Sequence, residues 1–165
     1  MKNVLVFDIA TETWFSQSTT PTTTDNSYPG GRVRFCAVVA SAQDNSSHNI
    51  YIYGGLDASS NNMVDIWVLT LPAFKWVPVY PTTDSEYYSN FGWTSGHSCH
   101  RVHEKHMVAY RGQNQNHTCD NDKGVGKFQG MTVYDMSSLK WTTRVEVGNP
   151  RYLVPESLYE IIGGG

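Results

Sequence analysis

One repeated pattern constrains the fold of this chain more than any other feature. A run of aliphatic and aromatic residues ends in Asp or Thr, and a Trp follows six residues later. The pattern occurs three times, at residues 4–8 with Trp14, 66–70 with Trp76, and 131–135 with Trp141. A strand, a polar turn and a Trp that opens a second strand are typical of a β-hairpin. We therefore expect three equivalent hairpins, with each Trp packed in its sheet.

Two further strands are predicted between the first and second hairpins. Residues 35–40 form a short apolar run, and residues 49–53 form another that ends at Gly54 and Gly55. Together with the hairpin that follows, they make a unit of four short strands. The high aromatic share of 13% suits pleated, half-buried surfaces.

The same arrangement recurs before the third hairpin. Residues 96–102 and 106–110 take the places of the two strands, and Arg111 and Gly112 take the double-glycine position. Helical patterning is confined to residues 153–162, where Pro155 suits a first helical turn. The sequence therefore predicts an all-β fold of antiparallel sheets.

This repeat resembles that of the Kelch family. The resemblance rests on Tyr51-Ile52-Tyr53-Gly54-Gly55, on the strand that ends in Phe7-Asp8, and on Trp14, Trp76 and Trp141. Kelch repeats are usually about 50 residues long, so the Trp spacings of 62 and 65 residues imply loop insertions. The sequence departs from the family at Thr70, where Asp is usual, and at Arg111, where Gly is usual.

The resemblance implies a partial β-propeller built of four-stranded antiparallel blades. Residues 1–16 would be the last two strands of an incomplete blade, and residues 17–79 would be a complete blade. Residues 80–147 would be a second blade with a long loop, and residues 148–165 an exit segment after the propeller. A closed ring needs about four to eight blades. We therefore expect a fragment of a larger propeller, completed by further blades of the same protein or by self-association.

A narrower resemblance, to fungal secreted or membrane-anchored Kelch proteins, concerns the cysteines. It rests on His97-Ser98-Cys99, Cys119-Asp120 and Lys123-Gly124-Val125. It implies a disulfide between Cys99 and Cys119 and an extracellular or cell-surface location, with a cytoplasmic location as the alternative. Cys36 is then expected to be an unpaired, buried core residue.

Charge and hydropathy argue against nucleic acid and against a membrane as partners of this chain. The chain has 12 Lys and Arg against 15 Asp and Glu, a net charge of −3. Its basic residues are scattered, whereas binding to nucleic acid requires clustered Lys and Arg. No apolar run approaches the roughly 20 residues of a membrane span. Neither nucleic acid nor membrane insertion of this segment is expected.

No catalytic or metal site is predicted. His97, His100, His103 and His106 stand three residues apart, but strand alternation would point His100 away from His97 and His103. Galactose oxidase shares the Kelch architecture, so part of a copper radical oxidase is the enzymatic alternative. Its copper site needs Tyr and His ligands and a Tyr–Cys crosslink drawn from several blades, which two blades do not supply. We expect no enzyme and no cofactor.

The function predicted is a non-catalytic interaction module that binds a protein partner. Aromatic residues and Arg commonly anchor protein interfaces. The candidate binding residues are Arg32, Arg34, Tyr87, Tyr88 and Trp93. Aromatic rings also stack on sugars, so a carbohydrate-binding or purely structural cell-surface domain is the other alternative.

Overall fold

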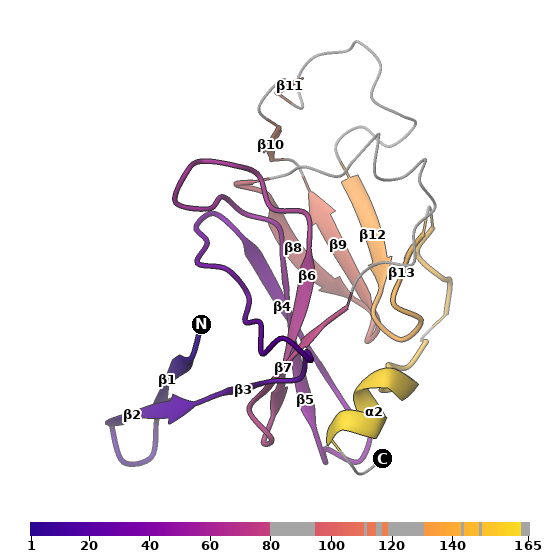
Figure 1. Cartoon of the computed structure of the whole chain (residues 1–165). Coiled ribbons are helices and arrows are strands. Elements are labelled where there is room, and N and C mark those ends of the chain that lie inside the picture. The colour runs from indigo at the N-terminus through magenta and orange to yellow at the C-terminus, as the bar shows by residue number, and fades with distance from the viewer. Residues whose placement is uncertain are drawn as a thin grey trace.

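The computed structural model describes residues 1–79, 95–110, 112–114, 117–118, 131–142, 144–148 and 150–162. Its first hairpin consists of β1 (Asn3–Asp8) and β2 (Thr13–Ser18) and projects from the rest of the molecule (Figure 1). The short strand β3 (Thr20–Pro21) then leads into the first large sheet.

The first large sheet has the strand order β3-β7-β6-β5-β4. Its four antiparallel strands are β4 (Cys36–Ser41), β5 (His48–Tyr53), β6 (Ile66–Leu71) and β7 (Lys75–Pro78). The sequence analysis did not predict β3, which pairs in parallel with β7 at the outer edge. This sheet otherwise has the four antiparallel strands expected of a blade.

The second large sheet has the strand order β13-β12-β9-β8. It contains β8 (Ser98–Val102), β9 (His106–Tyr110), β12 (Met131–Asp135) and β13 (Lys140–Thr142). A separate pair, β10 (Gln113–Asn114) and β11 (His117–Thr118), lies between β9 and β12 in the chain. The predicted all-β fold of four-stranded antiparallel sheets is confirmed, while the exact division at residues 17, 80 and 148 stays a prediction.

The three Trp hairpins share one geometry. Trp14 lies directly opposite Phe7, Trp76 opposite Leu69, and Trp141 opposite Tyr134. The residue two positions before each Trp has a positive φ: Glu12, Phe74 and Leu139, at 52°, 52° and 56°. A left-handed residue at the end of the turn lets a short loop close the hairpin.

Asp at the end of the first strand stabilises two of these turns. Oδ1 of Asp8 accepts hydrogen bonds from the main-chain N–H of Ala10 and Thr11. Oδ1 of Asp135 accepts the equivalent bonds from Ser137 and Ser138. At the equivalent position the hydroxyl of Thr70 donates to the carbonyl of Lys75 at 3.4 Å, and the main-chain N–H of Phe74 donates to the carbonyl of Thr70.

The main core lies between the two large sheets. Alternate residues of β4 (Cys36, Val38 and Ala40) face it, because side chains of a strand point to opposite sides in turn. The opposing sheet contributes Met107 and Tyr134. Trp141 packs at the margin of this core, with its ring centroid 5.1 Å from those of Tyr53 and Tyr134.

The opposite face of the first sheet carries a second apolar cluster. It consists of Ile52, Trp67, Leu69 and Trp76, with Met1, Val4 and Tyr28 packed against it. The buried position of Trp76 agrees with the expected packing of the repeat Trp residues. Trp14 differs, because its side chain is 65% exposed and its ring packs on Phe7 of the same hairpin.

The chain ends against both sheets. The helix α2 (Glu156–Ile162) begins after Pro155, as the sequence predicts, and buries Leu158 in the main core. The described part of the chain has no helix of the length and hydrophobicity that a membrane crossing requires.

Candidate functional site

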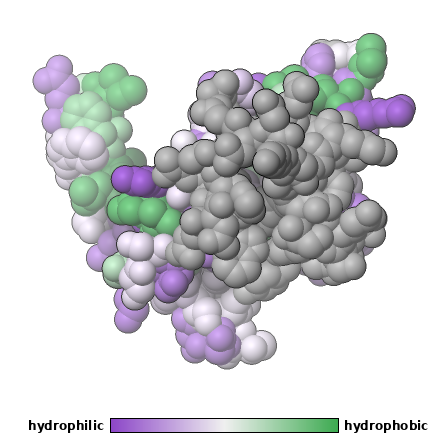
Figure 2. Space-filling model, turned by 90° about the horizontal axis from the view of Figure 1, so that it is seen from above, coloured by the Kyte–Doolittle hydropathy of each residue, from purple (hydrophilic) through white to green (hydrophobic). Residues whose placement is uncertain are grey.

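The first candidate surface is the projecting hairpin of β1 and β2. Its apolar side chains are exposed to an unusual degree, with Leu5 at 72%, Ile9 at 83% and Trp14 at 65%, beside the partly exposed Phe7 and Phe15. In Figure 2 this hairpin forms the left edge of the molecule, where hydrophobic residues gather. Phe7 lies opposite Trp14 and shares its face with Leu5, whereas Phe15 lies opposite Val6 on the other face, so both faces of the hairpin carry exposed apolar side chains. Exposed apolar surface is common at interaction sites.

The edge of β1 is also open. Strands β6 and β12 occupy the equivalent place in the two large sheets, and each pairs with a strand on both sides. Among the described residues, β1 pairs only with β2. Its outer edge therefore presents main-chain N–H and C=O groups that can receive another strand.

A second exposed apolar group lies on and just before β4. Val33, Phe35 and Val39 are exposed. Val39 lies opposite Ile50 of β5, and Ala37 lies opposite Ile52. Because cross-strand partners share a face, Val39 extends the face that carries the second apolar cluster. Only part of that face is covered by the beginning of the chain.

Arg32, a predicted binding residue, is committed to the interior. Its side chain is 0% exposed, and its guanidinium donates to both carboxylate oxygens of Asp65, at 2.7 and 3.0 Å. It also donates to the carbonyls of Gly30 and Gly54, and Trp67 Nε1 donates to Asp65 at 2.6 Å. A guanidinium used in this way positions the loop before β4 and does not reach a partner.

Of the other predicted binding residues, the structure describes only Arg34. Arg34 is exposed and has a φ of 56°, and its carbonyl accepts a hydrogen bond from Gly96 at 2.8 Å. Tyr87, Tyr88 and Trp93 lie outside the described residues. Their role in binding stays a prediction.

The glycines of the repeat have clear backbone reasons. Gly54 and Gly55 have φ values of 66° and 101°, and a Cβ on Gly55 would lie 2.7 Å from the carbonyl oxygen of Val33. Gly112 has a φ of 124°, and a Cβ there would meet His97 at 3.0 Å. Each close contact is with the segment just before the first strand of the same sheet, β4 or β8. These glycines therefore let two segments of one sheet approach each other closely.

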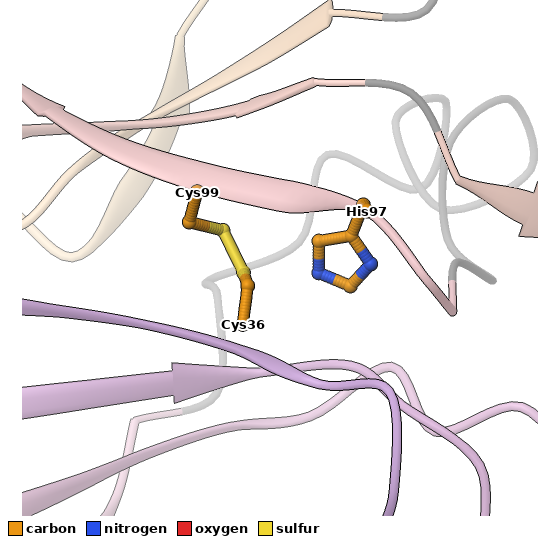
Figure 3. Close-up of side chains that lie close together, drawn as sticks. All are labelled: Cys36, His97 and Cys99. Atoms are coloured by element: carbon orange, nitrogen blue, oxygen red, sulfur yellow. A yellow bond between two sulfur atoms is a disulfide. The ribbon is translucent and has the colours of Figure 1, made fainter.

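A disulfide joins the innermost strands of the two large sheets. Cys36 of β4 is bonded to Cys99 of β8, with a Cα–Cα distance of 5.4 Å (Figure 3). The expected pairing of Cys99 with Cys119 is therefore wrong for this structure, and Cys36 is not an unpaired core residue. Cys119 lies outside the described residues. The sequence did not reveal the pairing because the two cysteines are 63 residues apart and only the side-by-side sheets bring them together.

His97 lies beside this disulfide. Its imidazole extends from the start of β8 into the space between the two sheets (Figure 3). The ring is buried, and neither nitrogen makes a hydrogen bond of normal geometry to a described residue. Burial lowers the pKa of His97 to about 4, and the main chain of Tyr53 opposes this shift weakly. The imidazole is therefore neutral at pH 7.

In a second group of possible metal ligands, the ammonium group of a lysine already pairs with two carboxylates. His106, Asp135 and Glu146 place donor atoms within 4.8 Å of one another. However, Lys105 Nζ lies 3.1 Å from Asp135 and 2.8 Å from Glu146. Burial by itself raises the pKa of Asp135, but hydrogen bonds from Lys105, Ser138 and Ser137 outweigh it and lower the pKa. This arrangement is an ion-pair network that stabilises the turn after β12.

The four regularly spaced histidines do not converge. His97 and His106 belong to different groups of potential ligands, and His100 is exposed on β8. His103 is in the turn between β8 and β9, with a φ of 51°. The structure thus agrees with the hairpin interpretation of this segment.

Comparison with known proteins settles the family. The chain is 30% identical, over 189 aligned residues and 99% of its length, to a Kelch repeat-containing protein of Arthroderma benhamiae. The chain belongs to the Kelch-repeat family. Its two large sheets are Kelch blades, and the β1–β2 hairpin shares the strand–turn–Trp geometry of β6–β7 and β12–β13. No family model matches the chain. The chain spans 26% of the length of that relative.

Proposed function

We propose that this chain is a non-catalytic interaction module that binds protein, as one part of a larger Kelch propeller. The observation that carries the proposal is the exposed apolar hairpin with an open strand edge. A hairpin of this kind pairs readily with another polypeptide, through main-chain hydrogen bonds and apolar side chains.

The covering strands have a defined place. In each Kelch blade of this chain, the strand equivalent to β1 pairs with a neighbour equivalent to β5 or β9. Two such strands beside β1 would complete a third blade. The much greater length of the Arthroderma relative supports a source in the same longer protein.

An extracellular or cell-surface location is part of the proposal. The Cys36–Cys99 disulfide supports it, because disulfides persist mainly in oxidising compartments. Because the sulfur atom of Cys36 is bonded to Cys99, Cys36 does not provide the Tyr–Cys crosslink that a copper radical oxidase needs. A non-catalytic role is therefore the better supported alternative.

The first test is the mass of the purified chain in solution as a function of concentration. Without covering strands, we expect the chain to self-associate through the β1–β2 hairpin. A double variant, Leu5→Lys with Trp14→Ser, should be monomeric over the same range. Val147→Lys is the matched control, because Val147 is fully exposed but lies outside the hairpin. A wild-type chain that stays monomeric at high concentration would count against the hairpin as an interface.

The second test identifies the type of partner. A photoreactive amino acid at position 14 should crosslink to a protein chain in cells that produce this protein, and the same group at position 147 should not. Crosslinking of equal extent at both positions would contradict the proposal. Saturable binding to an oligosaccharide that Trp14→Ser abolishes would favour the carbohydrate alternative.

A further inference from the structure

The junction between the innermost strands of the two blades brings three metal-binding side chains together. Cys36 comes from β4, whereas Cys99 and His97 come from β8 and the residue before it. His97 and Cys99 are two residues apart, so they point to the same side of extended backbone. The two sulfur atoms and a ring nitrogen lie within 4.8 Å of one another (Figure 3).

In the disulfide the two sulfur atoms are bonded to each other, so after reduction they must move apart to take the positions of a tetrahedral zinc site. Zinc binds thiolate sulfur and imidazole nitrogen at distances that place neighbouring donors roughly 3.5–3.8 Å apart. The Cα–Cα distance of 5.4 Å lets both sulfur atoms reach a shared ion without moving the strands far apart. The donors come from adjacent strands of a packed core, which holds their positions.

We propose that, once the Cys36–Cys99 disulfide is reduced, Cys36, Cys99 and His97 bind a zinc ion between the two blades. A water molecule would complete the tetrahedron. The site thus has two alternative states that hold the same two strands together, a disulfide under oxidising conditions and a metal ion under reducing conditions.

The conversion balances with a dithiol or phosphine as reductant. A dithiol supplies two electrons and two protons. A phosphine supplies two electrons, and one water molecule supplies two protons and the oxygen of the phosphine oxide. In both cases the S–S bond breaks and two thiols form. Binding of Zn²⁺ then releases the two thiol protons, because the thiolate is the ligand. The reductant leaves as its disulfide or as the phosphine oxide.

The ring of His97 packs on that of Tyr53, with centroids 4.9 Å apart, beside the two cysteines. His97 is 94% buried, yet both of its ring nitrogens lack a hydrogen bond of normal geometry to the described residues. Most buried polar groups are paired, so an unpaired one calls for a reason.

The donor set selects the type of metal. Two thiolates and one imidazole are soft and borderline ligands, which suit Zn²⁺. Ca²⁺ and Mg²⁺ prefer oxygen ligands. The site contains no carboxylate among its three donors, so these hard cations should not compete.

The test compares the two redox states of the whole chain. One sample is kept oxidised, and the other is reduced with a phosphine that is then removed under inert gas. Each is titrated with Co²⁺, which reports thiolate ligation by charge-transfer absorption, and then with Zn²⁺, with the bound metal counted by native mass spectrometry. We expect one ion per reduced chain, with two thiolate ligands, and none per oxidised chain.

Variants separate this site from other cysteines. His97→Ala should weaken binding to the reduced chain at least about 100-fold, since the loss of a residue that only hydrogen-bonds to a metal ligand already costs 10- to 100-fold. Cys119→Ser is the control and should bind like the wild type. Equal binding by the two redox states, or loss of binding in Cys119→Ser but not in His97→Ala, would overturn the proposal.

Reduction alone could unfold the chain, so folding is followed in parallel. An ion that binds only the folded state stabilises it. Excess Zn²⁺ should therefore raise the melting temperature of the reduced chain, or restore its β-sheet circular dichroism, and should not change the oxidised chain. A reduced chain that responds to Zn²⁺ no more than the oxidised chain does would overturn the proposal as well.

Discussion

Single residues position the loop that enters the first blade. The guanidinium of Arg32 lies in the interior and donates hydrogen bonds to the carboxylate of Asp65 and to two main-chain carbonyls. Asp65 in turn accepts a hydrogen bond from Trp67, a member of the second apolar cluster. Removal of one partner would leave a charge buried without compensation.

We expect Arg32→Ala to destabilise the chain by about 3 kcal/mol, which is the usual cost of breaking a buried ion pair. Arg34→Ala should change stability by less than about 0.5 kcal/mol, as is usual for an exposed residue. Urea unfolding of the two variants measures both values. Equal stability of the two variants would show that the Arg32 pair has no structural role.

A second prediction at this scale concerns Gly55. In Gly55→Ala, the new Cβ would lie 2.7 Å from a carbonyl oxygen, at a φ of 101°. We expect a loss of at least about 2 kcal/mol, from backbone strain and the clash together. Gly31→Ala is the matched control, because a Cβ there meets no atom within 4 Å. A Gly55→Ala chain that unfolds at the same urea concentration as Gly31→Ala would contradict this reading.

The sequence predicted the roles of residues that act locally and failed for residues whose partners lie far away in the chain. The repeat glycines and Trp residues were found because their roles are local: a turn, a cross-strand pair or a positive φ. Arg32 was assigned to binding and Cys99 was given the wrong partner. Asp65 lies 33 residues from Arg32, and Cys36 lies 63 residues from Cys99. Only the assembled sheets bring such pairs together.

Among the elements, the segment of residues 150–162 contacts both blades. Tyr152 is buried, and its hydroxyl lies 2.9 Å from that of Tyr51, which donates to the carbonyl of Met136. Asn49 also donates to Tyr152 at 3.2 Å. Burial raises the pKa of Tyr152 to about 12, so the hydroxyl stays protonated at neutral pH.

Tyr152→Phe should therefore cost about 1–2 kcal/mol, because it leaves buried partners without a hydrogen bond. Tyr159→Phe removes an equivalent hydroxyl from an exposed position of α2 and should be nearly neutral. Thermal unfolding followed by circular dichroism compares the two. A larger loss in Tyr159→Phe would place the important contact on the helix surface instead.

At the scale of elements, the sequence predicted where most strands lie but did not predict the pairing of β3 with β7. Alternating and apolar runs predicted the strands of both large sheets, and Pro155 marked the beginning of α2. The strand β3 was missed because two residues in a Thr-rich loop have no periodicity. Its existence depends on hydrogen bonds to β7, such as Thr20 N–H to the carbonyl of Phe74 at 3.0 Å.

For the whole molecule, the disulfide is the main covalent constraint between the blades. It closes a loop with a sequence separation of 63 residues. In the chain-entropy model such a closure stabilises the folded state by about 4 kcal/mol. We expect reduction in the presence of a metal chelator to lower the urea midpoint accordingly.

The control for this prediction is Cys119→Ser, which removes the remaining cysteine. Its urea midpoint in the oxidised state should match that of the wild type, and it should lose the same stability on reduction. If Cys119→Ser instead behaves like the reduced chain, the pairing involves Cys119, as the family resemblance first implied.

The parallel pairing of β3 with β7 determines how the chain resists mechanical force. A pull on Met1 first breaks its hydrogen bonds to Pro29, Thr19 and Trp76. It then loads the β1–β2 hairpin from its open end, so the hydrogen bonds of the hairpin break one after another. Beyond the hairpin, the same pull slides β3 lengthwise along β7, and the bonds of Thr20 and Thr22 carry the load together. Tension from the N-terminal side would therefore peel off the hairpin at low force and stop at β3, with both blades intact.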